Sequence, residues 1–134
     1  MLLEPAIARM AARRAKRDML AEHFLSQMSA VVDIKDPSQQ ALWSDCDRKF
    51  HHQLALMTED VLIGKIANEI EQSMKQPLWN RLRDDGIYDA ERIQLYVAEH
   101  RLIYEAIVSG DEECAARYVE GHLKRVRRDI TSLD

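Results

Sequence analysis

The sequence of 134 residues is poor in the residues that break helices, with only four glycines and three prolines. It also lacks alternating runs of β-branched residues, and its apolar positions recur at intervals of three and four. This spacing is typical of amphipathic helices and not of strands. We therefore expect an all-α protein, an antiparallel bundle of about five to seven helices that forms a single domain over residues 1–134.

Cysteine is equally scarce. Cys46 and Cys114 stand far apart, in neither a CxxC pair nor the dense framework of small secreted domains. No run approaches the roughly 20 apolar residues that span a bilayer, and none resembles the core of a signal peptide. These absences predict a cytoplasmic protein with no membrane partner. The net charge of −4 lacks the positive excess that phosphate contacts require, so we do not expect this chain itself to bind nucleic acid.

Capping residues divide the chain into helices. Asp36 is expected to cap the start of a helix with its carboxylate. Pro37 suits the first helical position, because a backbone N–H there would have no partner within the helix and proline has none. The sequence "SGD" at 109–111 supplies a glycine to end one helix and an aspartate to begin the next. The expected helices cover residues 2–32, as one long helix or two with a bend, then 37–57, 58–82, 90–108 and 112–131, with 83–89 as a loop.

The last two helices carry a histidine in the middle of an apolar face. His100 shares its face with Ile93, Tyr96, Ile103 and Ile107, and the face of His122 consists of Ala115, Val119, Val126 and Ile130. At about 1.5 Å of rise per residue, the two histidines lie roughly 15 and 18 Å from the connection between the helices. They are therefore expected nearly level across the hairpin.

Asp47 and His51 are four residues apart on the helix at 37–57, so their side chains can reach a common point. Buried imidazoles need polar partners, and a divalent metal ion would satisfy several of them together. We predict that the ion is held by Asp47, His51, His100 and His122. The alternative is a hydrogen-bonded core cluster without metal. His52 points about 100° away around its helix and His23 has no evident partner, so both are left out.

Catalytic motifs are missing. There is no Glu-x-x-His pair of the di-iron bundles, no HExxH, no paired-CxxC zinc motif, no Gly-rich phosphate loop and no GxSxG. We therefore do not expect an enzyme. A metalloenzyme stays open as an alternative, because a metal ion with open positions can activate water.

Three stretches in order, "LEPAIARMAARRA", "DRKFHHQLA" and "EHRLIYEAIVSGDEECAARYVEGHLKRV", resemble the FCD domain, the helical ligand-binding domain of a subgroup of GntR-type bacterial transcription regulators. In its metal-binding members the ligands are an aspartate and a histidine four apart and two later histidines. By resemblance these are again Asp47, His51, His100 and His122. The segment "QPLWNRL" at 76–82 is similar to the Pro-Leu-Trp segment of members that respond to sugar acids.

The resemblance implies an effector-sensing domain of a homodimeric regulator. Three neutral imidazoles and one carboxylate leave a divalent ion, such as zinc, nickel or manganese, with a net positive charge that attracts a small carboxylate effector. Family members usually carry a winged helix-turn-helix domain before this region and nothing here precedes Met1, so we expect contact with DNA only through that missing domain. A metal-free ligand-binding or dimerisation module of the same fold is the alternative.

Arginines are the candidates for binding the rest of an anionic effector, because the guanidinium group matches a carboxylate with two parallel hydrogen bonds. The sequence does not choose among five candidates: Arg13, Arg14, Arg81, Arg92 and Arg117.

Overall fold

The computed structural model describes residues 3–74 and 89–131, which form six α-helices and no strand, so the all-α prediction is confirmed. No helix in this part of the chain is both long and apolar enough to cross a bilayer. All but the last residue of the loop predicted at 83–89, and the end of the helix expected to reach residue 82, lie outside the described residues. The helices are α1 (Leu3–Arg14), α2 (Met19–Ser29), α3 (Pro37–Leu56), α4 (Val61–Met74), α6 (Ala90–Val108) and α7 (Glu112–Thr131).

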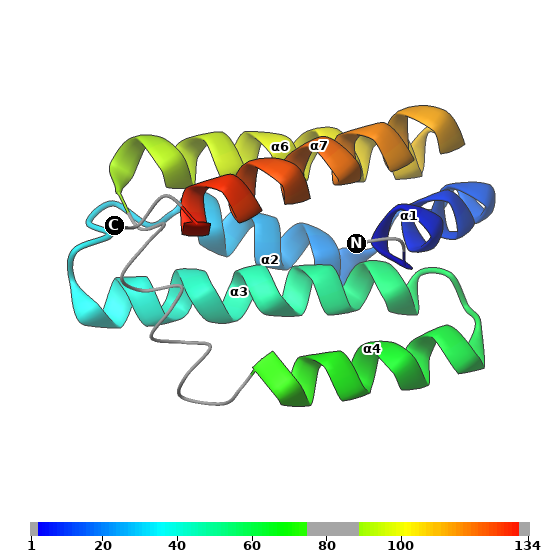
Figure 1. Cartoon of the computed structure of the whole chain (residues 1–134), viewed down its shortest axis with the longest axis horizontal. Coiled ribbons are helices and arrows are strands. Elements are labelled where there is room, and N and C mark those ends of the chain that lie inside the picture. The colour runs from blue at the N-terminus through cyan, green and yellow to red at the C-terminus, as the bar shows by residue number, and fades with distance from the viewer. Residues whose placement is uncertain (1–2, 75–88, 132–134) are drawn as a thin grey trace.

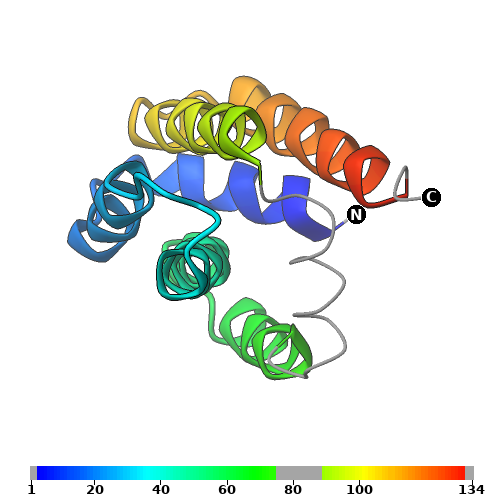
Figure 2. The same ribbon diagram turned by 90° about the vertical axis from the view of Figure 1, so that its left-hand side faces the viewer.

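The helices form a bundle in which α6 and α7 lie side by side along one face (Figure 1). Helix α1 packs against α7, α6 and α3, and Figure 2 shows it between the α6–α7 pair and α3. Helix α4 packs against α3 on the side away from α6 and α7. Helix α3 therefore faces other helices on two sides: one side faces α6 and α7, and the other faces α4.

The stretch expected as one helix or two is two helices, although it contains no glycine or proline at the break. Ala15 adopts a left-handed conformation with φ 50°, and the carboxylate of Asp18 caps α2 by accepting a hydrogen bond from Ala21 N–H. Asp18 N–H donates to the Tyr104 hydroxyl over 2.8 Å, and the Gln53 amide donates to Asp18 Oδ2 over 3.0 Å. Partners on α6 and α3 thus hold the bend in place.

The tight connection between α6 and α7 forms as predicted. Gly110 has φ 77°, a conformation that glycine adopts without steric cost. Asp111 N–H donates to Ala106 C=O over 2.9 Å, which closes the end of α6, and Asp111 Oδ1 accepts from Cys114 N–H to begin α7. Aspartates also cap three other helices by accepting a backbone N–H: Asp36 from Ser38, Asp60 from Ile63 and Asp89 from Arg92.

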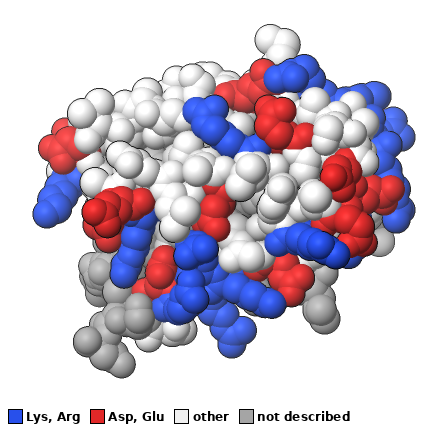
Figure 3. Space-filling model, turned by 90° about the horizontal axis from the view of Figure 1, so that it is seen from above, with Lys and Arg blue, Asp and Glu red and all other residues white. Residues whose placement is uncertain are grey.

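The core contains polar side chains as well as apolar ones. His100 is fully buried, while His122 and Asp47 are each 3% exposed. Large side chains around them, Trp43, Phe50 and Tyr96, are also buried. On the outside, acidic and basic side chains are intermixed over the face seen from the α6 and α7 side (Figure 3). The polar side chains whose burial needs an explanation are therefore Asp47, His100 and His122, inside the bundle.

Candidate metal centre

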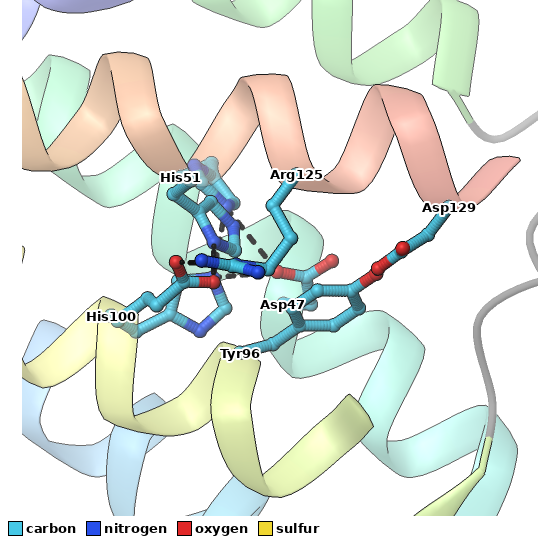
Figure 4. A network of polar contacts seen from close by, with 8 residues as sticks. Asp47, His51, Tyr96, His100, Arg125 and Asp129 are labelled. Atoms are coloured by element: carbon cyan, nitrogen blue, oxygen red, sulfur yellow. Dashed lines mark hydrogen bonds and ion pairs between the residues drawn. The ribbon is translucent and has the colours of Figure 1, made fainter. Parts of the chain in front are cut away.

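Three helices bring the four predicted ligands together. Asp47 and His51 lie one turn apart on α3, while α6 contributes His100 and α7 contributes His122. The ring centroids of His100 and His122 are 4.7 Å apart, as expected for histidines at the same level of the hairpin. One ligating atom from each of the three histidines can be chosen so that all lie within 4.8 Å of one another. Figure 4 shows the side chains of Asp47, His51 and His100 pointing toward one another.

Three of these side chains form a close triangle. The Nε2 atoms of His51 and His100 are 3.1 Å apart, and Asp47 Oδ1 lies 3.3 Å from the first and 3.1 Å from the second. A neutral imidazole carries one hydrogen and an ionised carboxylate carries none. With at most one hydrogen on each facing nitrogen, at least one of the three short contacts brings together two donors or two acceptors. Hydrogen bonding between these groups alone does not account for the triangle.

A shared cation does account for it. A metal ion about 2.0–2.1 Å from each donor atom separates neighbouring donors by roughly 2.8–3.0 Å in octahedral geometry and roughly 3.3–3.4 Å in tetrahedral geometry. The observed 3.1 to 3.3 Å lie between the octahedral and the tetrahedral separations. Imidazole nitrogen together with carboxylate oxygen is a donor set that suits zinc, nickel or manganese. The residues present therefore fit a divalent metal ion.

Glu99 on α6 orients the ring of His122. His122 Nδ1 lies 3.0 Å from Glu99 Oε1, and Arg125 Nε donates to the other oxygen of the same carboxylate over 3.1 Å. With Nδ1 directed at Glu99, Nε2 is the nitrogen on the far side of the ring and the one suited to ligate a metal. No pattern in the sequence predicted a role for Glu99, although it directly precedes His100 in the chain.

Aromatic side chains pack against the rings of His100 and His122. Phe50 lies against His100 with ring centroids 5.0 Å apart, and Tyr96 meets His122 edge to face at 5.5 Å. The Tyr96 hydroxyl in turn donates to the carboxylate of Asp129 near the end of α7 (Figure 4). Ligands held from several directions lose little freedom when a metal ion binds.

Burial sets the protonation of the centre. It lowers the pKa of His51 below its ordinary value, with Glu4 opposing the shift through its negative charge. The neutral ring that results is the form that binds a metal ion. For Glu99, burial acts to raise the pKa, but the hydrogen bonds from His122 and Arg125 outweigh it and the pKa is lowered. Glu99 is therefore held as the carboxylate that accepts from His122.

A cavity of about 230 Å³ opens beside the centre. Asp47, His51 and His122 all form part of its wall, so a small molecule in the cavity reaches the centre directly. Most of the remaining wall is apolar, and its other polar side chains are Glu4, Arg48, His52, Glu71 and Tyr96. The apolar wall is made by Ile7, Ala55, Ala67, Ile70, Leu123, Val126 and Ile130.

The predicted arginines that the structure describes do not line this cavity. Arg13 pairs with Glu112 over 2.7 Å and Arg14 with Glu59 over 2.5 Å. Four of the five candidates fall in the described part of the chain, and none of the four lines the cavity: Arg13, Arg14, Arg92 and Arg117. Arg81 lies outside the described residues. Within residues 3–74 and 89–131, the arginine that lines the cavity is Arg48, which stands directly after Asp47 in the sequence.

The two histidines left out of the ligand set are also outside the three-histidine group. His52 faces α4, where its Nε2 lies 2.5 Å from Asn68 Oδ1 and 3.5 Å from Glu71 Oε2. His23 is exposed on α2 and packs edge to face with Phe24. The helical phase assigned to His52 from the sequence agrees with this placement.

The family model of the FCD domain matches residues 1–125, nearly the whole chain. A search of curated proteins found no match to the sequence. The extent of the family match shows that the chain belongs to the FCD domain family, the effector-binding domains known from GntR-type regulators.

Proposed function

From this membership of the FCD family, we propose that the chain is the ligand-sensing domain of a GntR-type transcription regulator. It holds a divalent metal ion with Asp47, His51, His100 and His122 and binds a small carboxylate effector at that ion. The observation that carries the proposal is the triangle of Asp47 Oδ1, His51 Nε2 and His100 Nε2 at 3.1 to 3.3 Å, in contact with a cavity.

The charge of the centre favours an anionic ligand. Three neutral imidazoles and one carboxylate leave a divalent ion with a net charge of about +1. Zinc, nickel and manganese all accept carboxylate oxygens as further ligands, and a sugar acid is one such carboxylate. The metal ion supplies electrostatic attraction and a chelation point, while the cavity wall selects the rest of the molecule. We assign no catalytic role to the site.

Ligand binding would act on the bundle through three helices at once. Because α3, α6 and α7 each supply at least one metal ligand, an effector that displaces one of them changes how they pack together. In a homodimeric cytoplasmic regulator with a DNA-binding domain, such a shift would change the spacing of the two DNA-binding domains. The effector thereby couples to operator binding without touching DNA.

The experiment is elemental analysis of the purified protein, followed by calorimetric titration of lactate into metal-loaded and metal-stripped protein. The proposal expects about one ion per chain and carboxylate binding that requires the ion. A chain that takes up no zinc, nickel or manganese at saturating concentration would overturn it. Equal carboxylate affinity with and without the ion would instead identify a metal-free ligand-binding module.

A further inference from the structure

Helix α3 carries two pairs of polar side chains: Asp47 with His51, and Arg48 with His52. Arg48 and His52 each follow one residue after Asp47 and His51, so they lie about 100° further around the helix. The first pair faces α6, and the second faces α4, where both side chains meet Glu71. We call Arg48, His52 and Glu71 the distal group.

The distal group and the metal centre share one cavity. All three members of the distal group line it, as do Asp47, His51 and His122. Its volume of about 230 Å³ suits one small organic acid rather than a large cofactor. A ligand attached to the metal ion by one end and long enough to cross the cavity can therefore reach the distal group with its other end.

The distal group and the neighbouring Asp45 together hold two carboxylates and one guanidinium group. Arg48 Nη2 lies 3.0 Å from Asp45 Oδ1, and Arg48 Nε lies 3.9 Å from Glu71 Oε1. The side chains of Arg48 and Glu71 are only 10% and 15% exposed, and that of Asp45 is 54% exposed. Screening by water is weak around Glu71, so a further carboxylate placed beside it would be repelled.

The carboxylate of Glu71 suits a hydroxyl group instead. Glu71 lines the cavity, whereas Arg48 Nε is buried out of reach of a ligand and makes no hydrogen bond to the described residues. A ligand hydroxyl can donate its hydrogen to the Glu71 carboxylate, which an ionised ligand carboxylate cannot do.

We infer that Glu71 determines the specificity of this cavity: it admits acids with one carboxylate and a hydroxyl at the far end, and it rejects dicarboxylates of the same length. The inference rests on the proposed function for the metal end of the ligand. Glu71 adds the selection at the other end, by hydrogen bonding to a hydroxyl and by charge repulsion against a second carboxylate.

The test uses three acids on one carbon skeleton, which differ only at the far end. They are 2,6-dihydroxyhexanoate, 2-hydroxyhexanoate and 2-hydroxyadipate, titrated calorimetrically into metal-loaded protein. We expect the dihydroxy acid to bind at least about tenfold more tightly than 2-hydroxyadipate. Glu71→Gln replaces the carboxylate by an amide that can donate to a carboxylate, and it should reduce this ratio to about threefold or less.

The control is Glu69→Gln, which removes the same charge from an exposed position two residues away on α4 and should leave the ratio unchanged. Glu71→Ala is the second variant, and metal content and the melting temperature show whether each variant folds. An unchanged ratio in Glu71→Gln, or wild-type protein that binds 2-hydroxyadipate as tightly as the dihydroxy acid, would overturn the inference.

Two further outcomes separate this inference from the proposed function. If the protein binds metal and lactate but none of the three six-carbon acids, the inference about Glu71 fails while the metal centre stands. If the protein binds no metal, the proposed function fails first and the inference falls with it.

Discussion

The Nδ1 atom of His122 on α7 lies 3.0 Å from a carboxylate oxygen of Glu99 on α6. Glu99 stands next to His100 in the chain, so one dipeptide on α6 supplies a predicted metal ligand and orients another. The second oxygen of the same carboxylate accepts from Arg125, which keeps Glu99 in place. A carboxylate that accepts from a ligating histidine fixes the tautomer and strengthens the nitrogen as a ligand.

Replacing Glu99 by glutamine should therefore weaken metal binding without abolishing it. The amide keeps the shape of the side chain but loses the charge that favours the N–H on Nδ1 of His122. We expect metal affinity to fall by about 10- to 100-fold, measured by competition with a chromogenic chelator. Glu105→Gln, an exposed change on the same helix, is the matched control. Equal affinities in the two variants would show that Glu99 does not position the ligand.

Alanine in place of His100 or His122 should abolish metal binding, whereas His52→Ala should retain it. The first two rings lie in the three-histidine group, and His52 faces α4 instead. Metal content by mass spectrometry distinguishes the variants, and circular dichroism shows whether each one folds. Loss of metal in His52→Ala as complete as in His100→Ala would mean that the centre has been assigned to the wrong face of α3.

The sequence was sufficient to predict what depends on local spacing. Helical phase put His100 and His122 on inward faces, and Gly110 and Asp111 marked the turn that brings them level. What it did not predict depends on contacts between helices distant in the chain. Arg48 reaches the cavity only because α4 packs beside α3, which no local pattern reports.

The bend between α1 and α2 gives a second case. Nothing in the local sequence forces a break there, and the bend is held by Tyr104 and Gln53 from other helices. Tertiary contacts thus override a local preference for continuous helix.

Tyr104→Phe should loosen that bend. The change removes the hydroxyl that accepts from Asp18 N–H over 2.8 Å, and the freed N–H would lie beside an apolar ring. We expect the free energy of unfolding to fall by about 1 kcal/mol, with metal affinity unchanged. Urea unfolding of the metal-free protein measures this, and a variant as stable as the wild type would show that Ala15 and the Asp18 cap hold the bend unaided.

The Tyr104 hydroxyl, which donates to Glu22, makes the stability of the bend between α1 and α2 sensitive to alkaline pH. Burial, together with the hydrogen bond to Glu22, raises the pKa of Tyr104 to about 12. An unfolded tyrosine loses its proton near pH 10, so the folded state binds the proton more tightly. The contribution to stability is complete below pH 10 and is lost as the pH rises toward 12. Absorbance of the tyrosinate should show Tyr104 titrating in this late range, and Tyr104→Phe should lose the share of the signal that one tyrosine gives. Burial and the hydrogen bond to Asp129 raise the pKa of Tyr96 as well, so the late signal of Tyr96 should remain in the variant.

The chain alone should show no sequence-specific DNA binding at physiological salt. Its net charge is −4, and its described residues contain no strand from which the wing of a winged helix-turn-helix could form. Fluorescence anisotropy with promoter fragments and a scrambled duplex is the measurement. Preference for any one fragment over the scrambled duplex would contradict this prediction and would point to a basic surface outside the described residues.

Metal should stabilise the folded chain strongly at neutral pH and weakly in acid. Four ligands from three helices cannot converge in the unfolded chain, so the ion binds the native state and stabilises it by about 4 kcal/mol at a thousandfold excess over Kd. Burial lowers the pKa of His51 in the folded state, so protons favour the unfolded chain. The stability that comes from neutral His51 is therefore present above the ordinary histidine pKa of about 6.5 and is lost as the pH falls below it.

Protons also compete with the ion for the imidazoles, so acid should act in the same direction as removal of the metal. The measurement is thermal unfolding with added zinc, nickel or manganese and with a strong chelator, at pH 7.5 and at pH 5. A metal centre requires a chelator to lower the melting temperature by many degrees at pH 7.5 and by little at pH 5. If stripped and metal-loaded protein melted together at both values, Asp47 and the three histidines would form a hydrogen-bonded cluster that needs no ion.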